Sequence, residues 1–226
     1  MTAGLFLWGA LSQARLVAAL LTRAGTPPTH LFDHSLAAPA FATNAVFSNE
    51  AAGLRAALRD CSRFVVCIGG FHGAQRAALS LALRDRGGLL PLSVISPDAW
   101  IDPEATLEEG VQIMPRACVM LGTTVGAFSL LNTNCTVDHE CRIGRGVHVM
   151  GAAAIAGRVT IGDHASIGTN ATILPDLRIG AGARVGAGAV CLSDIGENAV
   201  VVGVPARPIR TEPPLVDLSW LEAALG

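Results

Sequence analysis

The sequence predicts an α/β N-terminal domain with a small Rossmann-like parallel sheet, followed by a left-handed parallel β-helix of hexapeptide repeats. Three observations predict it. Apolar runs alternate with helical stretches over residues 5–95, aliphatic residues recur every six positions from residue 101 onward, and only 4% of the 226 residues are aromatic. The expected domains are residues 1–95, residues 96–212, and a C-terminal tail with a short helix at residues 213–226.

The first part of the chain carries the pattern of a parallel sheet with helices on its faces. Gly25, Pro27 and the pair Gly87-Gly88 mark the ends of two helical stretches. The predicted strands are residues 5–8, 30–33, 64–68 and 92–95, and the predicted helices are residues 11–24, 51–60 and 74–86.

The second part follows a period of six. Fifteen aliphatic residues stand at six-residue spacing from Ile101 to Val185, and a small or β-branched residue follows most of them four positions later. Each hexapeptide should form one short strand and one corner, and three should form one triangular coil of 18 residues, so about five coils are expected. Cys135 and Cys141 occupy small-residue positions and are interpreted as core residues.

Glycine follows several of the aliphatic residues, as at Gly144 and Gly162, and is expected to allow the tight backbone path at the corners. After Val185 the register is expected to fail. Residues 198–205 should then form an extended exit from the prism, followed by a short helix at residues 215–225.

Composition excludes several classes of function. A net charge of −2 does not favour nucleic acid or an anionic membrane surface, and all sixteen basic residues are arginine, which excludes a lysine Schiff base or a Walker-type phosphate loop. No apolar run reaches the roughly 18 residues of a membrane span. The six cysteines form no CxxC pair and no signal peptide precedes them, so we expect no metal, no disulfide framework, no membrane insertion and a cytoplasmic location.

Several motifs of the repeat region resemble a known family. They are Asn132 to Cys141 with the sequence NTNCTVDHEC, the later His148, the pairs Ile161-Gly162 and Ile167-Gly168, and the exit Val202 to Arg207 with the sequence VGVPAR. Together they resemble the sialic acid O-acetyltransferase and UDP-4-amino-sugar N-acetyltransferase group of sugar acyltransferases. The resemblance covers nearly the whole chain and is most specific in the repeats.

This resemblance implies a homotrimer with three active sites between neighbouring prisms, and acetyl-CoA as the acyl donor along the groove. His139 matches the general base, and Glu140 matches the acid that strengthens this base. His148 matches a position that contacts acetyl-CoA, and Thr169 and Ala187 match positions where backbone groups of later coils meet the cofactor.

In the front domain, the resemblance implies a pocket for a nucleotide-sugar acceptor. Gly9, Ser12 and Gln13 lie in the turn after the first strand, Asp33 matches a position that contacts the nucleobase, and Gly69 matches another side of the pocket. Gln13 stands where the family carries a histidine, and Ala14 replaces a glycine.

The residues also support this chemistry directly. Acyl transfer from a thioester needs a base for the attacking amine or hydroxyl, and an imidazole suits this role near neutral pH. His139 follows the inward-facing Val137 by two residues, so it should lie at a corner and point outward. His148 lies nine residues further, which is half a coil, so the two histidines can share a site only across a contact between subunits.

We therefore expect an acetyltransferase that acts on a nucleotide-linked amino sugar in polysaccharide biosynthesis. The acceptor should attack the thioester directly, because no Cys or Ser is paired with His139. Alternatives are an O-acetyltransferase of a sugar such as sialic acid and a non-catalytic trimeric ligand-binding protein. A zinc enzyme of the carbonic anhydrase type would need three histidine ligands, which the spacing of His139, His148 and His164 does not resemble, and His164 is expected to be solvated.

Overall fold

A computed structural model describes residues 4–225 of the chain, which form two compact units. The first unit contains the N-terminal residues up to Ile68, the segment Ala78–Val94 and the residues from Val216 onward. The second unit contains Gly69–Ala77 and Ile95–Leu215. Over this described range, no helix is long and apolar enough to cross a membrane.

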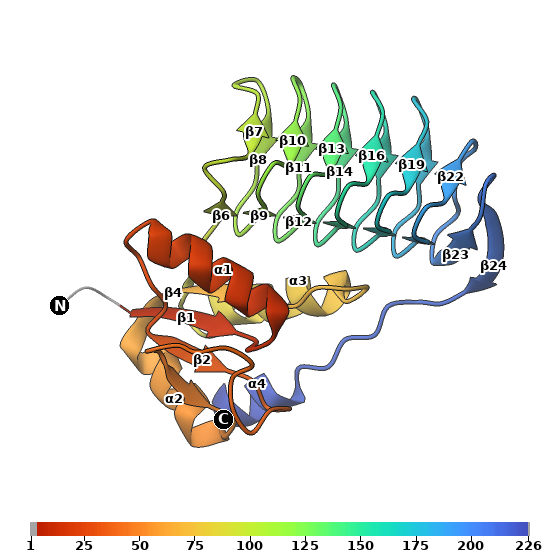
Figure 1. Ribbon diagram of the computed structural model, residues 1–226. Helices are drawn as coiled ribbons and strands as arrows, with labels where there is room; N and C mark the ends of the chain where they lie inside the picture. The colour runs from red at the N-terminus through yellow and green to blue at the C-terminus, as the bar shows by residue number, and fades with distance from the viewer. Residues whose placement is uncertain (1–3, 226) are drawn as a thin grey trace. The chain divides into compact units, whose positions relative to one another are not determined.

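The first unit is a parallel five-stranded sheet with helices on both faces, as predicted (Figure 1). The strand order is β3-β2-β1-β4-β5, and every pairing is parallel. The strands are β1 (Gly4–Trp8), β2 (His30–Phe32), β3 (Val46–Ser48), β4 (Cys61–Val66) and β5 (Leu90–Pro91), and the helices are α1 (Ser12–Arg23), α2 (Ala51–Asp60), α3 (Gly73–Asp85) and α4 (Ser219–Leu225). The first turn of α3 belongs to the second unit.

Alternation along β1 explains why helices cover both faces of this sheet. Phe6 and Trp8 point to one face, where they form a core with residues of α2, α3 and α4. Leu5 and Leu7 point to the other face and are also buried. Val17 of α1 is buried as well, and α1 lies on the opposite side of the sheet from α2 and α4 (Figure 1).

The second unit is a β-helix with three faces (Figure 1). Within each face, short strands from successive coils pair in parallel. The first face contains β7 (Trp100–Ile101), β10 (Cys118–Val119), β13 (Thr136–Val137), β16 (Ala154–Ile155), β19 (Thr172–Ile173) and β22 (Val190–Cys191). The second face contains β8 (Thr106–Leu107), β11 (Thr124–Val125), β14 (Arg142–Ile143), β17 (Thr160–Ile161) and β20 (Arg178–Ile179). The third face contains β6 (Val94–Ile95), β9 (Gln112–Ile113), β12 (Leu130–Leu131), β15 (His148–Val149), β18 (Ser166–Ile167), β21 (Arg184–Val185), β23 (Ala199–Val202) and β24 (Arg207–Thr211).

The period of six has a direct structural cause, and the predicted core is confirmed. Val119, Val137 and Ile155 stand 18 residues apart, pair in register across the first face, and are at most 1% exposed. Cys135 and Cys141 lie in the same core at 0% exposure. Burial raises the pKa of both thiols, that of Cys135 to about 12, so both remain protonated and apolar.

The corners impose a left-handed backbone at every sixth residue. Positive φ angles recur at Asn134, Glu140 and Gly146 and continue at Arg158 one coil after Glu140. The glycines that directly follow the aliphatic residues have another role. A Cβ on Gly144 would lie 2.7 Å from the backbone nitrogen of Asp163 in the next coil, so Gly144 permits close stacking of coils.

Two expectations for the first 95 residues need correction. The strand β3 was not predicted, because the three residues Val46–Ser48 are too short to give a periodic signal. The expected strand at residues 92–95 is divided. The N–H of Leu92 donates to Phe64 beside the edge strand β5, whereas β6 is the first strand of the third β-helix face.

The end of the repeat also differs from the expectation. The register does not fail at Val185, because Cys191 stands six residues later, is fully buried and pairs with Ile173. The exit is not simply extended. It forms an antiparallel hairpin in which β23 pairs with β24 and also joins β21. The short C-terminal helix is confirmed as α4, which begins at Ser219.

Candidate active site

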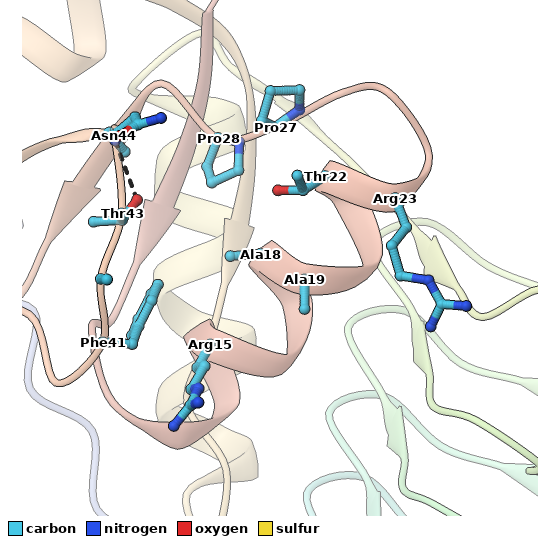
Figure 2. A pocket seen from close by; sticks show the side chains of 12 residues that line it. Arg15, Ala18, Ala19, Thr22, Arg23, Pro27, Pro28, Phe41, Thr43 and Asn44 are labelled. Atoms are coloured by element: carbon cyan, nitrogen blue, oxygen red, sulfur yellow. Dashed lines mark hydrogen bonds between the residues drawn. The ribbon is translucent and has the colours of Figure 1, made fainter.

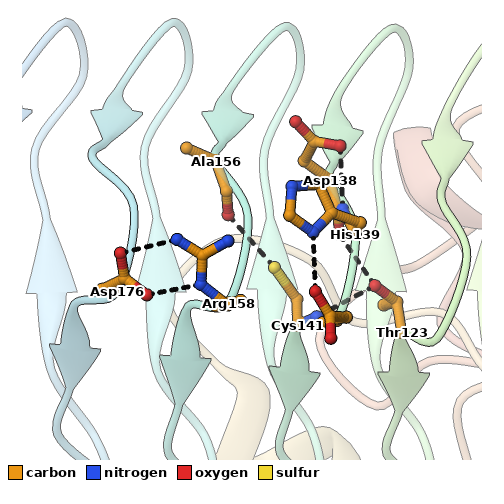
Figure 3. A network of polar contacts seen from close by, with 8 residues as sticks. Thr123, Asp138, His139, Cys141, Ala156, Arg158 and Asp176 are labelled. Atoms are coloured by element: carbon orange, nitrogen blue, oxygen red, sulfur yellow. Dashed lines mark hydrogen bonds and ion pairs between the residues drawn. The ribbon is translucent and has the colours of Figure 1, made fainter.

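His139 lies at the corner where the first face of the β-helix ends and the second begins (Figure 3). Val137 points into the core and is fully buried, so His139, two residues later, leaves the coil outward. Thr123 of the preceding coil fixes this corner. Its hydroxyl donates to the carbonyl of Asp138 at 2.7 Å and accepts from the N–H of Cys141 at 3.1 Å. The turn that carries His139 is thus held at both ends by a buried side chain.

The imidazole of His139 is paired with the carboxylate of Glu140, at 3.0 Å between Nδ1 and Oε2. A carboxylate only accepts, so the Nδ1–H donates and the lone pair of the neutral ring lies on Nε2. Within residues 4–225, no hydrogen bond to Nε2 is found. The side chain is 37% exposed, so the free nitrogen can meet a substrate. This arrangement is what a general base requires.

Gly157 lies directly beneath the imidazole, one coil after His139. A Cβ built at this position would be 2.5 Å from both Cε1 and Nε2 of His139. Only glycine therefore leaves room for the ring as it stands. The spacing of 18 residues could have identified this position from sequence, because a coil is three hexapeptides long.

Two more charged residues continue the same corner. The guanidinium of Arg158 donates to the carboxylate of Asp176 through two hydrogen bonds of 2.6 and 2.8 Å (Figure 3). The hydrogen bond from Arg158 holds the pKa of the Asp176 carboxyl below its usual range, and the same contact raises the pKa of Arg158. Both side chains are at least half exposed.

His148 has a different environment from His139. It lies on the third face, is 3% exposed, and its Nδ1–H donates to the carbonyl of Gly70 at 2.8 Å. Its Nε2 is 3.4 Å from the side-chain nitrogen of Asn132. Burial, with a smaller contribution from the charge of Arg76, lowers the pKa of His148 to about 4, so the ring is neutral near pH 7. Its predicted contact with acetyl-CoA stays a prediction.

Arg76 accounts for part of this environment, and sequence reasoning missed it. The side chain is 1% exposed and donates to the carbonyls of Phe128, Gly146 and Val147 at 2.7 to 3.0 Å. Phe128 and Gly146 are left-handed corner residues, whose carbonyls the guanidinium satisfies. In an Ala-rich helical stretch, no sequence signal separates such an arginine from a solvated one.

The expectation that His164 is solvated is wrong. Its ring is half-buried, its Nδ1 is buried without a hydrogen-bond partner among the residues that the structure covers, and burial lowers the pKa of the imidazole. The cause is crowding at its corner, where a Cβ on Gly146 would lie 2.8 Å from Nδ1 of His164.

Thr169 and Ala187 lie one coil apart at the corner between the third and first faces. Both are exposed, and the carbonyl of Thr169 accepts from the N–H of Gly188 at 2.8 Å. This corner borders the opposite edge of the first face from the His139 corner. Their predicted contact with the cofactor stays a prediction.

A shallow hollow of about 510 Å³ lies on the first face between these two corners. Asp138 and Ala156, which neighbour His139 and Gly157, line one side of it, and Met120 and Leu174 extend it along the coils. The first face therefore offers an open, largely apolar surface beside the candidate base.

The structure brings Gly9 and Asp33 of the predicted acceptor site together. The N–H of Gly9 donates to the carbonyl of Phe32 at 2.7 Å, and a Cβ on Gly9 would lie 2.9 Å from the carbonyl oxygen of Cys67. Asp33 accepts from the N–H of Ala10 at 3.0 Å and from the N–H and hydroxyl of Ser35. Asp33 therefore also fixes the loop after β2.

The other predicted acceptor residues are less closely grouped. Ser12 is exposed at the start of α1 and Gln13 follows it, whereas Gly69 belongs to the second unit. A hollow of about 820 Å³ in the first unit lies elsewhere, between α1 and the segment 41–45, with Arg15 and Arg23 at its wall (Figure 2). None of the predicted acceptor residues lines it.

No metal centre is found among the described side chains, in which three or more His, Cys, Asp or Glu residues never gather as a ligand set.

Comparisons with known proteins agree with this geometry. The family of bacterial transferase hexapeptide (six repeats) matches residues 140–175 and 158–193. A GDP-perosamine N-acetyl transferase from Caulobacter crescentus, crystallised with CoA and GDP-perosamine as a histidine-to-alanine variant, is 30% identical. The similarity covers 93% of this chain and 98% of that chain, with a TM-score of 0.83. This chain belongs to the hexapeptide-repeat sugar acetyltransferases.

Two other sugar acetyltransferase structures are also similar. The acetyltransferase domain of PglB from Neisseria gonorrhoeae, in complex with acetyl coenzyme A, is 26% identical with a TM-score of 0.82 and covers 92% of this chain and 100% of that chain. WeeI from Acinetobacter baumannii AYE is 27% identical with a TM-score of 0.82 and the same coverage. A search of curated protein sequences finds no significant match.

Proposed function

We propose that this hexapeptide-repeat acetyltransferase moves the acetyl group of acetyl-CoA to the amine of a nucleotide-linked sugar, with His139 as the general base. The observation that carries the proposal is the contact of His139 Nδ1 with Glu140, which leaves Nε2 free at an exposed corner. The relatives crystallised with CoA and GDP-perosamine, or with acetyl coenzyme A, support this donor and this class of acceptor.

The reaction follows from the placement of the imidazole. The acceptor nitrogen attacks the carbonyl carbon of the thioester, the carbonyl π electrons move to oxygen, and a proton of the attacking nitrogen passes to Nε2 of His139. Collapse of the tetrahedral intermediate expels the CoA thiolate, which takes that proton from the imidazolium. Glu140 orients the ring and stabilises the imidazolium while it exists. The products are the N-acetylated sugar and CoA thiol.

The protein should act as a homotrimer, with each site completed by a neighbouring β-helix. The first face supports this assembly, because it leaves large apolar side chains in solvent two or three coils before and after the coil that carries His139. Trp100 is 59% exposed, Leu174 is 38% exposed and Leu192 is 56% exposed. Exposed large apolar side chains on one face are typical of an interface between subunits. The cytoplasmic location remains a prediction from the cysteine pattern.

Gly9, Ser12, Gln13, Asp33 and Gly69 remain the proposed acceptor residues, and His148, Thr169 and Ala187 the proposed cofactor contacts. A kinetic screen tests the proposed reaction. CoA thiol release is measured with a panel of nucleotide-linked amino sugars and with the same sugars that carry a hydroxyl in place of the amine. Release with amino sugars alone supports N-acetylation. Release with hydroxyl acceptors alone would indicate O-acetylation, and no release with any acceptor would argue against catalysis.

A further inference from the structure

The corner that carries His139 continues as a column of charged residues. Glu140, Arg158 and Asp176 stand 18 residues apart on consecutive coils, and all three have left-handed backbones with φ of 58°, 60° and 65°. The N–H of Arg158 donates to the carbonyl of His139, and the N–H of Asp176 donates to that of Gly157. Because neighbouring strands stack about 4.8 Å apart, each of the three side chains lies within reach of the next.

Arg158 thus stands between two carboxylates, each one coil away. A guanidinium can form a two-bond contact with either of them. In the structure it uses Asp176 for both hydrogen bonds, at 2.6 and 2.8 Å (Figure 3). The carboxylate of Glu140 instead accepts from Nδ1 of His139. Charge alternates along the column, and each carboxylate has one partner.

Which of the two carboxylates Arg158 binds affects the hydrogen bond of the His139 imidazole. If the guanidinium turned to Glu140, it would compete with the Nδ1–H of His139 for the same oxygens. A ring without its acceptor can carry the proton on Nε2 instead, and in that tautomer Nε2 cannot take a proton from the substrate. A second carboxylate that occupies Arg158 prevents this competition.

We propose that Asp176 is a positioning residue that holds Arg158 away from Glu140 and so keeps the Glu140 carboxylate on Nδ1 of His139. The proposal rests on the proposed role of His139 as the base. The charged groups that surround His139 at this corner are Asp138, Glu140, Arg158 and Asp176. The hydrogen bond from Arg158 lowers the pKa of the Asp176 carboxyl, which keeps it ionised under assay conditions.

A double-mutant cycle tests the proposal. Asp176→Ala should lower kcat about fivefold, with little change in the KM for acetyl-CoA. The effect on kcat is modest because an exposed ion pair between Arg158 and Glu140 is weak, so it displaces His139 from Glu140 only part of the time. Asp176→Ala combined with Arg158→Ala removes the competing cation and should return kcat to within about twofold of the wild type. Asp85→Ala breaks a similar exposed pair with Arg84 in the first unit and serves as the matched control, with kcat unchanged.

Nitrogen-15 chemical shifts of His139 give a second readout. The wild type should carry its proton on Nδ1, and Asp176→Ala should shift the ring toward the Nε2-protonated tautomer. A double variant as slow as Asp176→Ala alone, or a single variant with wild-type kcat and tautomer, would overturn the proposal.

His139→Ala separates this proposal from the proposed function. An inactive His139→Ala enzyme beside a fully active Asp176→Ala enzyme refutes the positioning role alone. An active His139→Ala enzyme refutes the base itself.

Discussion

His139 and His148 lie nine residues apart in the same β-helix, yet the chain gives them opposite surroundings. Both rings donate through Nδ1, His139 to the Glu140 carboxylate at 3.0 Å and His148 to the Gly70 carbonyl at 2.8 Å. His139 is 37% exposed at a corner, whereas His148 is 3% exposed on the third face of the β-helix, near the cation of Arg76.

The acceptor at Nδ1 and the exposure of the ring together decide what each imidazole can do. A carboxylate stabilises the imidazolium that forms when a base takes a proton, and an exposed Nε2 can meet the acceptor. Burial and, to a smaller extent, the nearby guanidinium of Arg76 keep His148 uncharged, although the hydrogen bond to Gly70 acts in the opposite direction, so within one chain His148 contributes packing and a hydrogen bond.

Replacement of the two residues of the candidate base should have the largest effect. His139→Ala should lower kcat roughly 10² to 10⁴-fold, the usual contribution of a positioned base, with CoA binding nearly intact. Glu140→Ala should cost less, because it removes only the partner of the ring. Steady-state kinetics on the folded oligomer measure both. A His139→Ala enzyme that kept more than about a tenth of wild-type kcat would contradict general-base catalysis.

Gly157→Ala should be next in size. The new Cβ would stand 2.5 Å from Nε2 of His139, so the ring must move, and a displacement of about 1 Å can lower kcat about 100-fold. Gly196→Ala is the matched control, because no atom lies within 4 Å of its Cβ position. Equal kcat values for the two variants would show that the position of the ring above Gly157 is unimportant.

The buried histidine should act on stability. The folded state lowers the pKa of His148 to about 4, so below its unfolded pKa the unfolded chain binds a proton that the folded chain does not. Stability is therefore full above about pH 6.5 and is lost as the pH falls toward 4, by about 2 kcal/mol between pH 7.5 and 5.

His148→Asn offers a matched variant, because its side-chain amide can still donate to Gly70 and does not titrate. Urea unfolding at the two pH values should show a loss of stability about 2 kcal/mol smaller than in the wild type. The other groups with lowered pKa values remain in both proteins and cancel in the difference. Identical pH dependence in both proteins would argue against the buried neutral ring.

A smaller effect is expected in the front domain. Asp33→Ala should raise the KM for the acceptor about tenfold, the value of a lost charged hydrogen bond, and leave the KM for acetyl-CoA nearly unchanged. Ser35→Ala is the control, since it removes one internal partner of Asp33 and keeps the carboxylate. Equal changes in both KM values for Asp33→Ala would place the acceptor elsewhere.

The sequence predicted the β-helix well because every coil repeats the same requirement. An inward aliphatic residue and a small residue four positions later are visible at any point of the chain, so Val137, Cys135 and the outward position of His139 followed from spacing alone. The division of residues 92–95 between two sheets could not be predicted, because an apolar run does not show which strand it will pair with.

Contacts between segments that are far apart in the chain could not be predicted from the sequence either. The burial of His148 depends on Gly70 and Arg76, which lie more than 70 residues earlier. No pattern in the neighbouring sequence distinguishes Gly70 or Arg76 from other residues of their type. The ion pair of Arg158 and Asp176 is different, since both occupy the same corner position one coil apart, and the repeat could have suggested it.

A crystal structure of the complex with CoA and a nucleotide-linked amino sugar would show whether His139 can take a proton from the acceptor. Nε2 of His139 should lie within about 2.6 to 3.2 Å of the acceptor nitrogen, with the Glu140 carboxylate still hydrogen-bonded to Nδ1. An acceptor nitrogen held far from Nε2, with another side chain or the cofactor itself at hydrogen-bond distance, would contradict it.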